Sequence, residues 1–233
     1  MSGSLQLAPL LRRYGTFLGF LLIVSFFWSQ RPDTFMTTRN WLNITQQVSI
    51  LCVISFTMTL VMVGGDFDLS VGSMASLSGM IAAVLWQQDV SLFWALGAAV
   101  LVGAFGGVFN GVLVAYAGLS AFVATLGTLT IFSGLALLVS DGKTIFGRAI
   151  PEIVGDFSRG GLPLAEGIQL PNLTLIAILV LILMGIVLQH TVFGRNLHAV
   201  GGNREASILA GVPVAQLRLI AFAVNGVGAA IAG

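Results

Sequence analysis

The sequence has 233 residues, of which 57% are hydrophobic and only 8% are charged. A soluble globular domain carries about a quarter charged residues, so this composition excludes that class. The net charge of +1 gives no reason to expect a nucleic-acid partner, and the single cysteine, Cys52, excludes an intrachain disulfide.

Long apolar runs predict an all-α fold, a polytopic transmembrane helical bundle in which each span needs about 20 residues. Six full spans are predicted, over residues 14–30, 45–63, 71–87, 92–117, 121–139 and 172–190. A further apolar run begins at Leu219 and stops at Gly233, which is too short for a comfortable crossing. We therefore expect one transmembrane domain over residues 1–233, made of six spans and the start of a seventh, with its remaining C-terminal spans missing.

The N-terminus resembles a secretory signal, because Arg12 and Arg13 precede an apolar run. No small-x-small cleavage site follows, which predicts a retained first span. The positive-inside rule does not decide the orientation, since the basic residues divide equally between the two sides. The arginine pair and the long 140–171 loop favour a cytoplasmic N-terminus, with residues 64–70 and 190–214 inside.

The stretch GGDFDLSVGS, residues 64–73, places Asp66 and Asp68 between two apolar runs. A charge in hydrocarbon costs at least about 2.5–3.5 kcal/mol on insertion scales, so neither carboxylate can face lipid. One interpretation is a turn in which Asp68 or Ser70 caps the helix that follows. The other is a helix break that lines a polar pathway, as transporters use. The candidate pathway residues are Gly65, Asp66, Asp68, Ser70, Gly72 and Ser73.

Small residues recur at helical spacing within the predicted spans. Gly103, Gly107 and Gly111 repeat every four residues in the span over 92–117. Lipid supplies no hydrophobic drive for helix pairing, so small residues that let backbones approach closely favour association. These glycines predict tight helix packing.

Catalytic and metal-binding patterns fail on inspection. An intramembrane aspartyl protease of the GxGD type needs glycine where this chain has Val63, and DGKT at 141–144 lacks the phosphate-loop glycine at Leu137. His190 and His198 have no acidic or thiol partner at ligand spacing. We predict no catalytic residue, no metal site and no cofactor bound by this chain.

The stretch RNLHAVGGNREASILAGVPV, residues 195–214, predicts a short helix between two spans. Asn203 can cap a helix over 204–210, and Gly211 followed by Val-Pro ends it. Such a helix either connects passively or docks into a groove of a partner.

Three stretches carry a family resemblance: GDFDLSVGS at 65–73, FVATLGTLTIFSGLALLVSDGKTI at 122–145 and FGRNLHAVGGNREASILAGV at 193–212. Together they resemble the permeases of ABC importers of the ribose and xylose type, over about residues 35–233. Glu205, Ala206 and Gly211 match the EAA loop of these importers, with Ser207 in place of the second alanine.

The resemblance implies a permease subunit that carries a monosaccharide or related small polyol across the bacterial inner membrane. Its implied partners are a second permease copy or close homologue, ABC ATPase subunits that use ATP and Mg²⁺, and a periplasmic sugar-binding protein. It places the following residues in the loop that meets the ATPase: Gly201, Gly202, Asn203, Glu205, Ala206 and Gly211.

Two alternatives remain open at this point. A secondary, ion-coupled transporter would need an acidic residue at mid-bilayer, for which Asp66 and Asp68 are the only candidates. The other alternative is a truncated remnant without transport activity, because family members usually continue for several more spans. The sugar itself is not specified, and for Phe67 and Asn110 a packing role is favoured over substrate contact.

Overall fold

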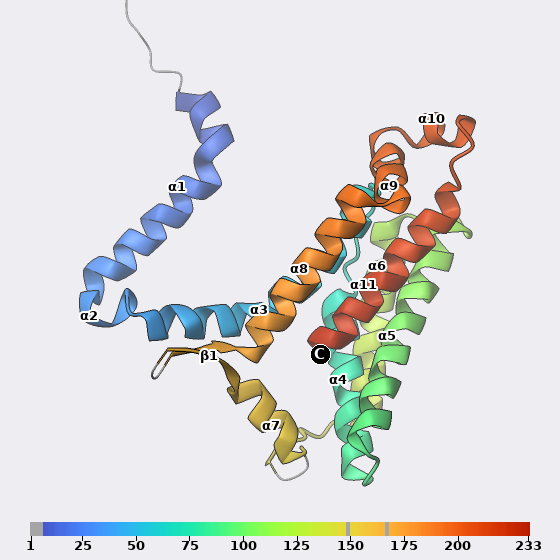
Figure 1. Cartoon of the computed structure of the whole chain (residues 1–233). Helices are drawn as coiled ribbons and strands as arrows, with labels where there is room; N and C mark the ends of the chain where they lie inside the picture. Colours follow the sequence, from blue (N-terminus) through green and yellow to red (C-terminus); the bar gives the residue numbers. More distant parts are fainter. Residues whose placement is uncertain (1–6, 148–149, 166–167) are drawn as a thin grey trace, which may run out of the picture.

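The computed structural model describes residues 7–147, 150–165 and 168–233, and helices dominate this part of the chain (Figure 1). The helices are α1 (Leu7–Gln30), α2 (Pro32–Phe35), α3 (Thr38–Val63), α4 (Val71–Gln87), α5 (Leu92–Ala115), α6 (Ala121–Val139), α7 (Glu152–Arg159), α8 (Asn172–His190), α9 (Val192–Gly202), α10 (Arg204–Leu209) and α11 (Val214–Ala232). Strands β1 (Gly161–Ala165) and β2 (Ile168–Pro171) form an antiparallel hairpin. The predicted fold class, an all-α polytopic bundle, is confirmed.

Five helices in the described ranges are long and apolar enough to cross a membrane, namely α3, α5, α6, α8 and α11. Helix α4 is apolar but has only 17 residues. Helix α1 covers the predicted first span but is not among the five, and its early turns carry Arg12 and Arg13. The bounds of α4, α6 and α8 are those predicted from the sequence.

The last helix differs from its prediction. Helix α11 begins at Val214, directly after Pro213, and its 19 residues make it one of the span-length helices. The prediction that this run starts at Leu219 and is too short to cross was therefore wrong. Arg218 suggested the boundary, because an unpaired charge is not tolerated in a span. In the fold Arg218 is buried and paired, so the helix continues through it.

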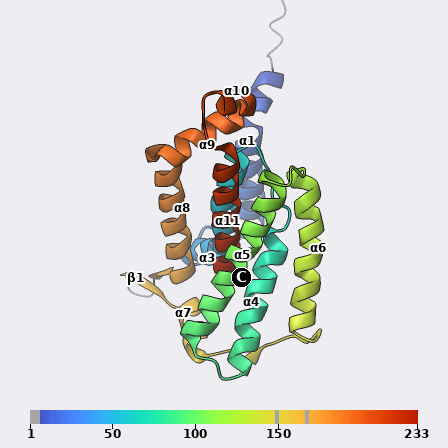
Figure 2. The same cartoon turned by 90° about the vertical axis from the view of Figure 1, so that its right-hand side faces the viewer.

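Helix α11 lies in the middle of the bundle, where it packs against α3, α4 and α5 (Figure 2). Its closest approach is to α5, along the glycines that repeat every four residues. A Cβ on Gly107 would overlap the backbone carbonyl of Phe222, and one on Gly103 would overlap Ala230. On α11, Gly226 lies directly against the backbone of Gly103. Small residues on both helices thus allow the two backbones to touch.

The two ends of the bundle differ in composition. Helices α9 and α10 lie at one end, together with the turn that leaves α3, whereas α7, the hairpin and the α4–α5 turn lie at the other (Figure 1). At the α9 end, a cluster of buried side chains that includes Leu60, Val114, Leu197 and Phe222 joins α3, α5, α6, α9 and α11. Helix α9 is therefore packed into the bundle, although the sequence analysis did not predict it as a helix.

Candidate functional site

The α3–α4 connection, residues 64–70, meets the end of α9. A Cβ on Gly201 would overlap the carbonyl oxygen of Val63, and one on Gly65 would lie 3.6 Å from the Cα of Gly201. Gly65 has a φ of +82°, which an L side chain rarely adopts and which ends α3 in a tight turn. The two stretches that the sequence analysis singled out separately therefore form one site, in which backbone touches backbone.

Asp66 is held by a bidentate ion pair with Arg218 of α11. The Nε atom of Arg218 donates to Oδ2 of Asp66 at 2.6 Å, and Nη2 donates to Oδ1 at 2.8 Å. The remaining Nη1 donates to the carbonyl oxygen of Val114, near the end of α5, at 3.1 Å. The two charged side chains are only 7% and 10% exposed. Because the pair is side-on and desolvated, it joins the α3–α4 connection to both α5 and α11.

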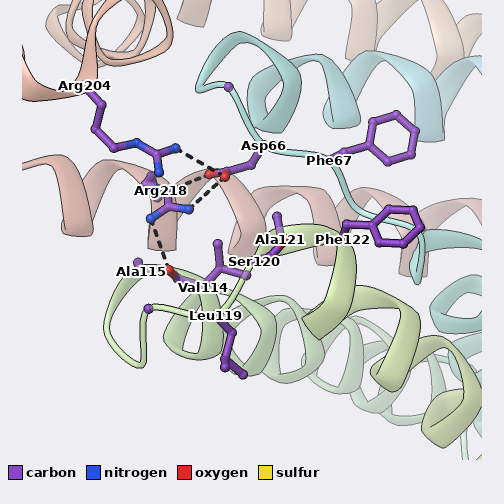
Figure 3. Close-up of a pocket in the computed structure, with 12 residues that line it drawn as sticks. Asp66, Phe67, Val114, Ala115, Leu119, Ser120, Ala121, Phe122, Arg204 and Arg218 are labelled. Carbon is purple, nitrogen blue, oxygen red and sulfur yellow. Dashed lines mark hydrogen bonds and ion pairs between the residues drawn. The ribbon is translucent and has the colours of Figure 1, made fainter.

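Arg204, the first residue of α10, makes a weaker second contact with Asp66. Its Nη2 lies 3.3 Å from Oδ1, and the arginine side chain is 40% exposed (Figure 3). The carboxylate is already neutralised by Arg218, so the second cation gains little Coulomb energy in a solvated position. Arg204 thus links α10 to the bundle through a contact that is easily broken.

Asp68 occupies a different environment, because its partners are all neutral. Its Oδ1 accepts hydrogen bonds from the backbone N–H of Ser70 at 2.8 Å and from the Ser70 hydroxyl at 2.6 Å. Its Oδ2 accepts from the Asn225 side-chain amide of α11 at 3.0 Å. Asn110 of α5 donates to the Ser70 hydroxyl at 2.8 Å. Asp68 is 3% exposed and ties three helices together.

The predicted capping role of Asp68 and Ser70 is only partly met. Ser70 occupies the N-cap position of α4, but its side chain accepts no hydrogen bond from the first turn. Asp68 accepts from Ser70 itself rather than from the N–H groups of α4. Ser73, in the first turn, donates its hydroxyl to the carbonyl oxygen of Ser70 at 2.8 Å, whereas a Cβ on Gly72 would meet only open space.

The α3–α4 connection also reaches deeper than a surface turn. Asn225 stands eleven residues after Val214, so it lies about 16 Å along α11 at 1.5 Å per residue. Its partner Asp68 is therefore well inside the bundle, and α4 starts there, which explains why α4 is short. The stretch between α3 and α4 is thus a break in helical structure within the bundle, and its lining of a polar pathway stays a prediction. Irregular backbone at such depth is tolerated because it is buried in protein.

A pocket of about 680 Å³ opens beside Asp66. It is lined by the α3–α4 connection, the turn between α5 and α6, and the two arginines that contact Asp66 (Figure 3). The side chains of Phe67 and Phe122 lie next to each other at one side of it, both substantially exposed. Asn110, in contrast, is 1% exposed and belongs to the Asp68 network.

The predicted loop helix forms as α10 and protrudes from the bundle. The Oδ1 atom of Asn203 accepts a hydrogen bond from the N–H of Ala206 at 3.0 Å, and Gly211 has a φ of +78° just after the helix. Leu209 is 89% exposed. The other two glycines assigned to this loop, Gly201 and Gly202, are not on α10 but end α9.

Comparison with known protein families shows which family this chain belongs to. The family model described as the permease component of branched-chain amino acid transport systems matches residues 40–233. The chain belongs to this permease family. The match covers every helix that forms the site, from α3 to α11.

Relatives of this permease include several sugar transport proteins. The D-allose transport system permease protein AlsC of Escherichia coli is 34% identical, over 95% of this chain and 66% of the relative. The ribose import permease protein RbsC of Bacillus subtilis is 33% identical, over 96% of this chain and 67% of the relative. The L-arabinose permease protein AraH of Escherichia coli is 36% identical, over 85% of this chain and 58% of the relative. The chain thus spans about two thirds of the length of its first relatives, and no solved structure matches it significantly.

The other chemistry considered from the sequence does not come together in the permease. In the DGKT stretch, Lys143 pairs with Asp141 at 2.8 Å on the surface, with both side chains more than 70% exposed. Among the residues that the structure describes, no three histidine, cysteine or acidic side chains gather as metal ligands would. The contacts that the described residues make at this site are ion pairs and hydrogen bonds that join the α3–α4 connection to α5, α10 and α11.

Sequence reasoning missed the partners of the two aspartates. Arg218 and Asn225 are the signals that were available, because a charge and a lone amide within an apolar run each need a buried partner. Asn110 is a third such residue, and its side-chain oxygen has no hydrogen-bond partner within the described part of the chain. What no pattern showed is which of these residues meets which aspartate.

Proposed function

We propose that this chain is a membrane subunit of an ATP-driven importer that carries a monosaccharide or a related polyol across the bacterial cytoplasmic membrane. The observation that carries the proposal is the similarity, over 95% and 96% of the chain, to permease proteins named for allose and ribose. The family description names branched-chain amino acids instead, so the sugar class rests on these relatives. The similarity favours this function over a secondary, ion-coupled transporter.

The proposed contact with a partner ATPase is the α10 end of the bundle. Helix α10 protrudes there, exposes Ile208 and Leu209, and presents Glu205 in its first turn. Closure of an ATPase against α10 would push on α9, whose Gly201 touches the α3–α4 connection. Because that connection is tied to α5 and α11 through Asp66 and Arg218, the push reaches the helices of the bundle.

The orientation follows from the same assignment. If α10 faces ATP, the α10 end of the bundle is cytoplasmic, and the end that carries α7 and the hairpin faces outward. Figure 1 draws the start of α1 on the same side as α10, which supports a cytoplasmic N-terminus. In this proposal a periplasmic binding protein delivers the sugar at the opposite end, and a second copy or close relative completes the pathway.

The function is tested by reconstituting the chain in vesicles with its ATPase and its binding protein. We expect uptake of a labelled sugar that requires ATP on the side of the membrane where the ATPase is bound. This uptake should persist when ionophores abolish the proton gradient. Uptake that follows the proton gradient without ATP would contradict the proposal and return the chain to the secondary transporters. No uptake of allose, ribose, arabinose or xylose under any condition would refute the sugar class.

The coupling contact is tested by Glu205→Arg. We expect uptake and sugar-stimulated ATP hydrolysis to fall about tenfold, the change that a loss of 1.4 kcal/mol of contact energy produces. Membrane insertion should stay intact, because Glu205 is exposed in the first turn of α10 and makes no buried contact. Glu205→Gln, which removes the charge without reversing it, is the matched control and should fall less. Uptake by Glu205→Arg at the level of the parent would exclude this role.

A further inference from the structure

Helix α7 segregates its charged side chains from its apolar ones. At about 100° per residue, Glu152, Asp156 and Arg159 fall within an arc of about 60°. Ile153 and Phe157 occupy the neighbouring arc, one turn apart on the same side of the helix. Both apolar side chains are largely exposed, at 61% and 48%. The helix therefore presents an apolar stripe that the described chain leaves about half exposed.

Hydrogen bonds hold α7 at the start of a membrane span. Asn172 is the first residue of α8. Its side-chain amide donates a hydrogen bond to the carbonyl oxygen of Phe157 at 2.9 Å, and its backbone N–H donates one to the carbonyl oxygen of Gly160 at 3.0 Å. From α3, the Gln46 side chain donates to the carbonyl oxygen of Ser158 at 2.8 Å. Helix α7 is thus fixed within one hydrogen bond of the residue where α8 begins. It cannot stand away from the bilayer surface.

We propose that α7 lies in the membrane interface, with Ile153 and Phe157 among the lipid acyl chains and the charged arc toward water. The membrane is the occupant because hydrogen bonds hold α7 at the first residue of α8, a helix of span length whose apolar side chains, such as Leu179 and Ile182, are exposed. Strand β1, which follows α7, exposes two further apolar side chains, Leu162 and Leu164. Amphipathic helices of this kind sit about 5–10 Å into the boundary between headgroups and acyl chains. This inference goes beyond the transport function and does not depend on it.

The charges of α7 define the kind of lipid contact. Two carboxylates and one guanidinium remain on the polar arc, and Arg159 pairs with Asp156 at 2.9 Å. The helix therefore carries no excess of basic side chains that would attract anionic headgroups. The contact should be hydrophobic, and it should depend little on salt or on the charge of the lipid.

The placement is tested by spin labels on the full chain in phosphatidylcholine vesicles. The background is Cys52→Ser, which removes the only cysteine of the sequence. Phe157→Cys and Ile153→Cys report on the apolar arc, and Asp156→Cys is the matched control on the polar arc. The measurement is the collision rate of each label with oxygen, which concentrates in the acyl region, and with a water-soluble nickel chelate.

For each label we take the ratio of its collision rate with oxygen to its collision rate with the chelate. We expect this ratio to be at least about threefold higher at 153 and 157 than at 156. Adding phosphatidylglycerol or 1 M salt should leave this ratio unchanged. Equal chelate access at 156 and 157 would overturn the proposal, because the apolar arc would then face water. Protection of 153 and 157 from both reagents would also overturn it, since a second copy or another protein would then cover the stripe. Two independent reporters keep the result decisive if one variant fails to insert.

Discussion

The two ends of the α3–α4 connection each carry a buried carboxylate, Asp66 and Asp68, and the two carboxylates are stabilised by different partners. Asp66 is neutralised by a guanidinium, in a bidentate pair near the α10 end of the bundle. Asp68, only two residues later, lies deeper and is satisfied by neutral donors from its own segment and from α11. A charge that can reach an arginine takes a strong, directional partner, whereas a charge beyond that reach needs several hydrogen bonds. The first end joins the α3–α4 connection to α5 and α11, and the second holds the start of α4 against α11.

The largest effect is expected from Asp66→Asn, which tests the charged end. Arg218 is 10% exposed, and the change leaves its guanidinium without a carboxylate. Breaking one side of a buried ion pair costs about 3–5 kcal/mol, so we expect the free energy of unfolding to fall by that amount. Thermal unfolding in detergent should show a melting temperature lower by about 10 °C.

A second substitution separates charge from packing at that end. Arg218→Met in the Asp66→Asn background removes the stranded cation while keeping most of the side-chain volume, and it should restore much of the lost stability. If Asp66→Asn alone melts with the parent chain, the pair is not desolvated in the membrane and the comparison between the two ends fails.

A smaller effect is expected from Asp68→Asn, the same change at the neutral end. The asparagine keeps one acceptor oxygen, but its new amide hydrogens face either the donors of Ser70 or the amide of Asn225. One unsatisfied buried donor costs about 1–3 kcal/mol, so the loss should be below that of Asp66→Asn. The same unfolding assay compares the two variants directly, and a larger loss at position 68 would reverse the assignment of roles.

The smallest change in stability is expected from Arg204→Ala. Its contact with Asp66 is long, at 3.3 Å, and half in solvent, and exposed ion pairs contribute about 0–1 kcal/mol. Arg159→Ala, which removes a surface pair at the other end of the bundle, is the matched control and should melt similarly. If Arg204 carries motion from α10, its alanine variant should still lose uptake while the control keeps it. Loss of stability as large as in Asp66→Asn would show instead that Arg204 is part of the buried pair.

Features that depend on residues close together in the sequence were predicted, whereas contacts between residues far apart in the chain were not. The bounds of α6 and α8 and the cap of α10 at Asn203 were predictable because apolar runs and local turn residues define them. Helix α9 was missed although Phe193, Leu197 and Val200 recur at helical spacing, because this apolar stripe is short and lies among glycines and polar residues; packing of these side chains in the bundle stabilises the helix.

The pairing of Asp66 with Arg218 was missed for a related reason. Their separation along the chain is long, and a single sequence shows that each charge needs a partner but not which partner it has. The start of α11 was misplaced at Leu219 for a related reason, since the apolar run was counted only from the residue after Arg218. The partners Asn110 and Asn225 likewise became interpretable only when the fold brought them to Asp68 and Ser70.

The buried arginine of α11 has a consequence for biogenesis. When α11 enters the membrane, Arg218, its fifth residue, is costly to bury without a counter-ion. Asp66, which follows α3, is synthesised before α11. The carboxylate that neutralises Arg218 thus precedes it in the order of synthesis, so the buried pair needs no segment that is made after α11.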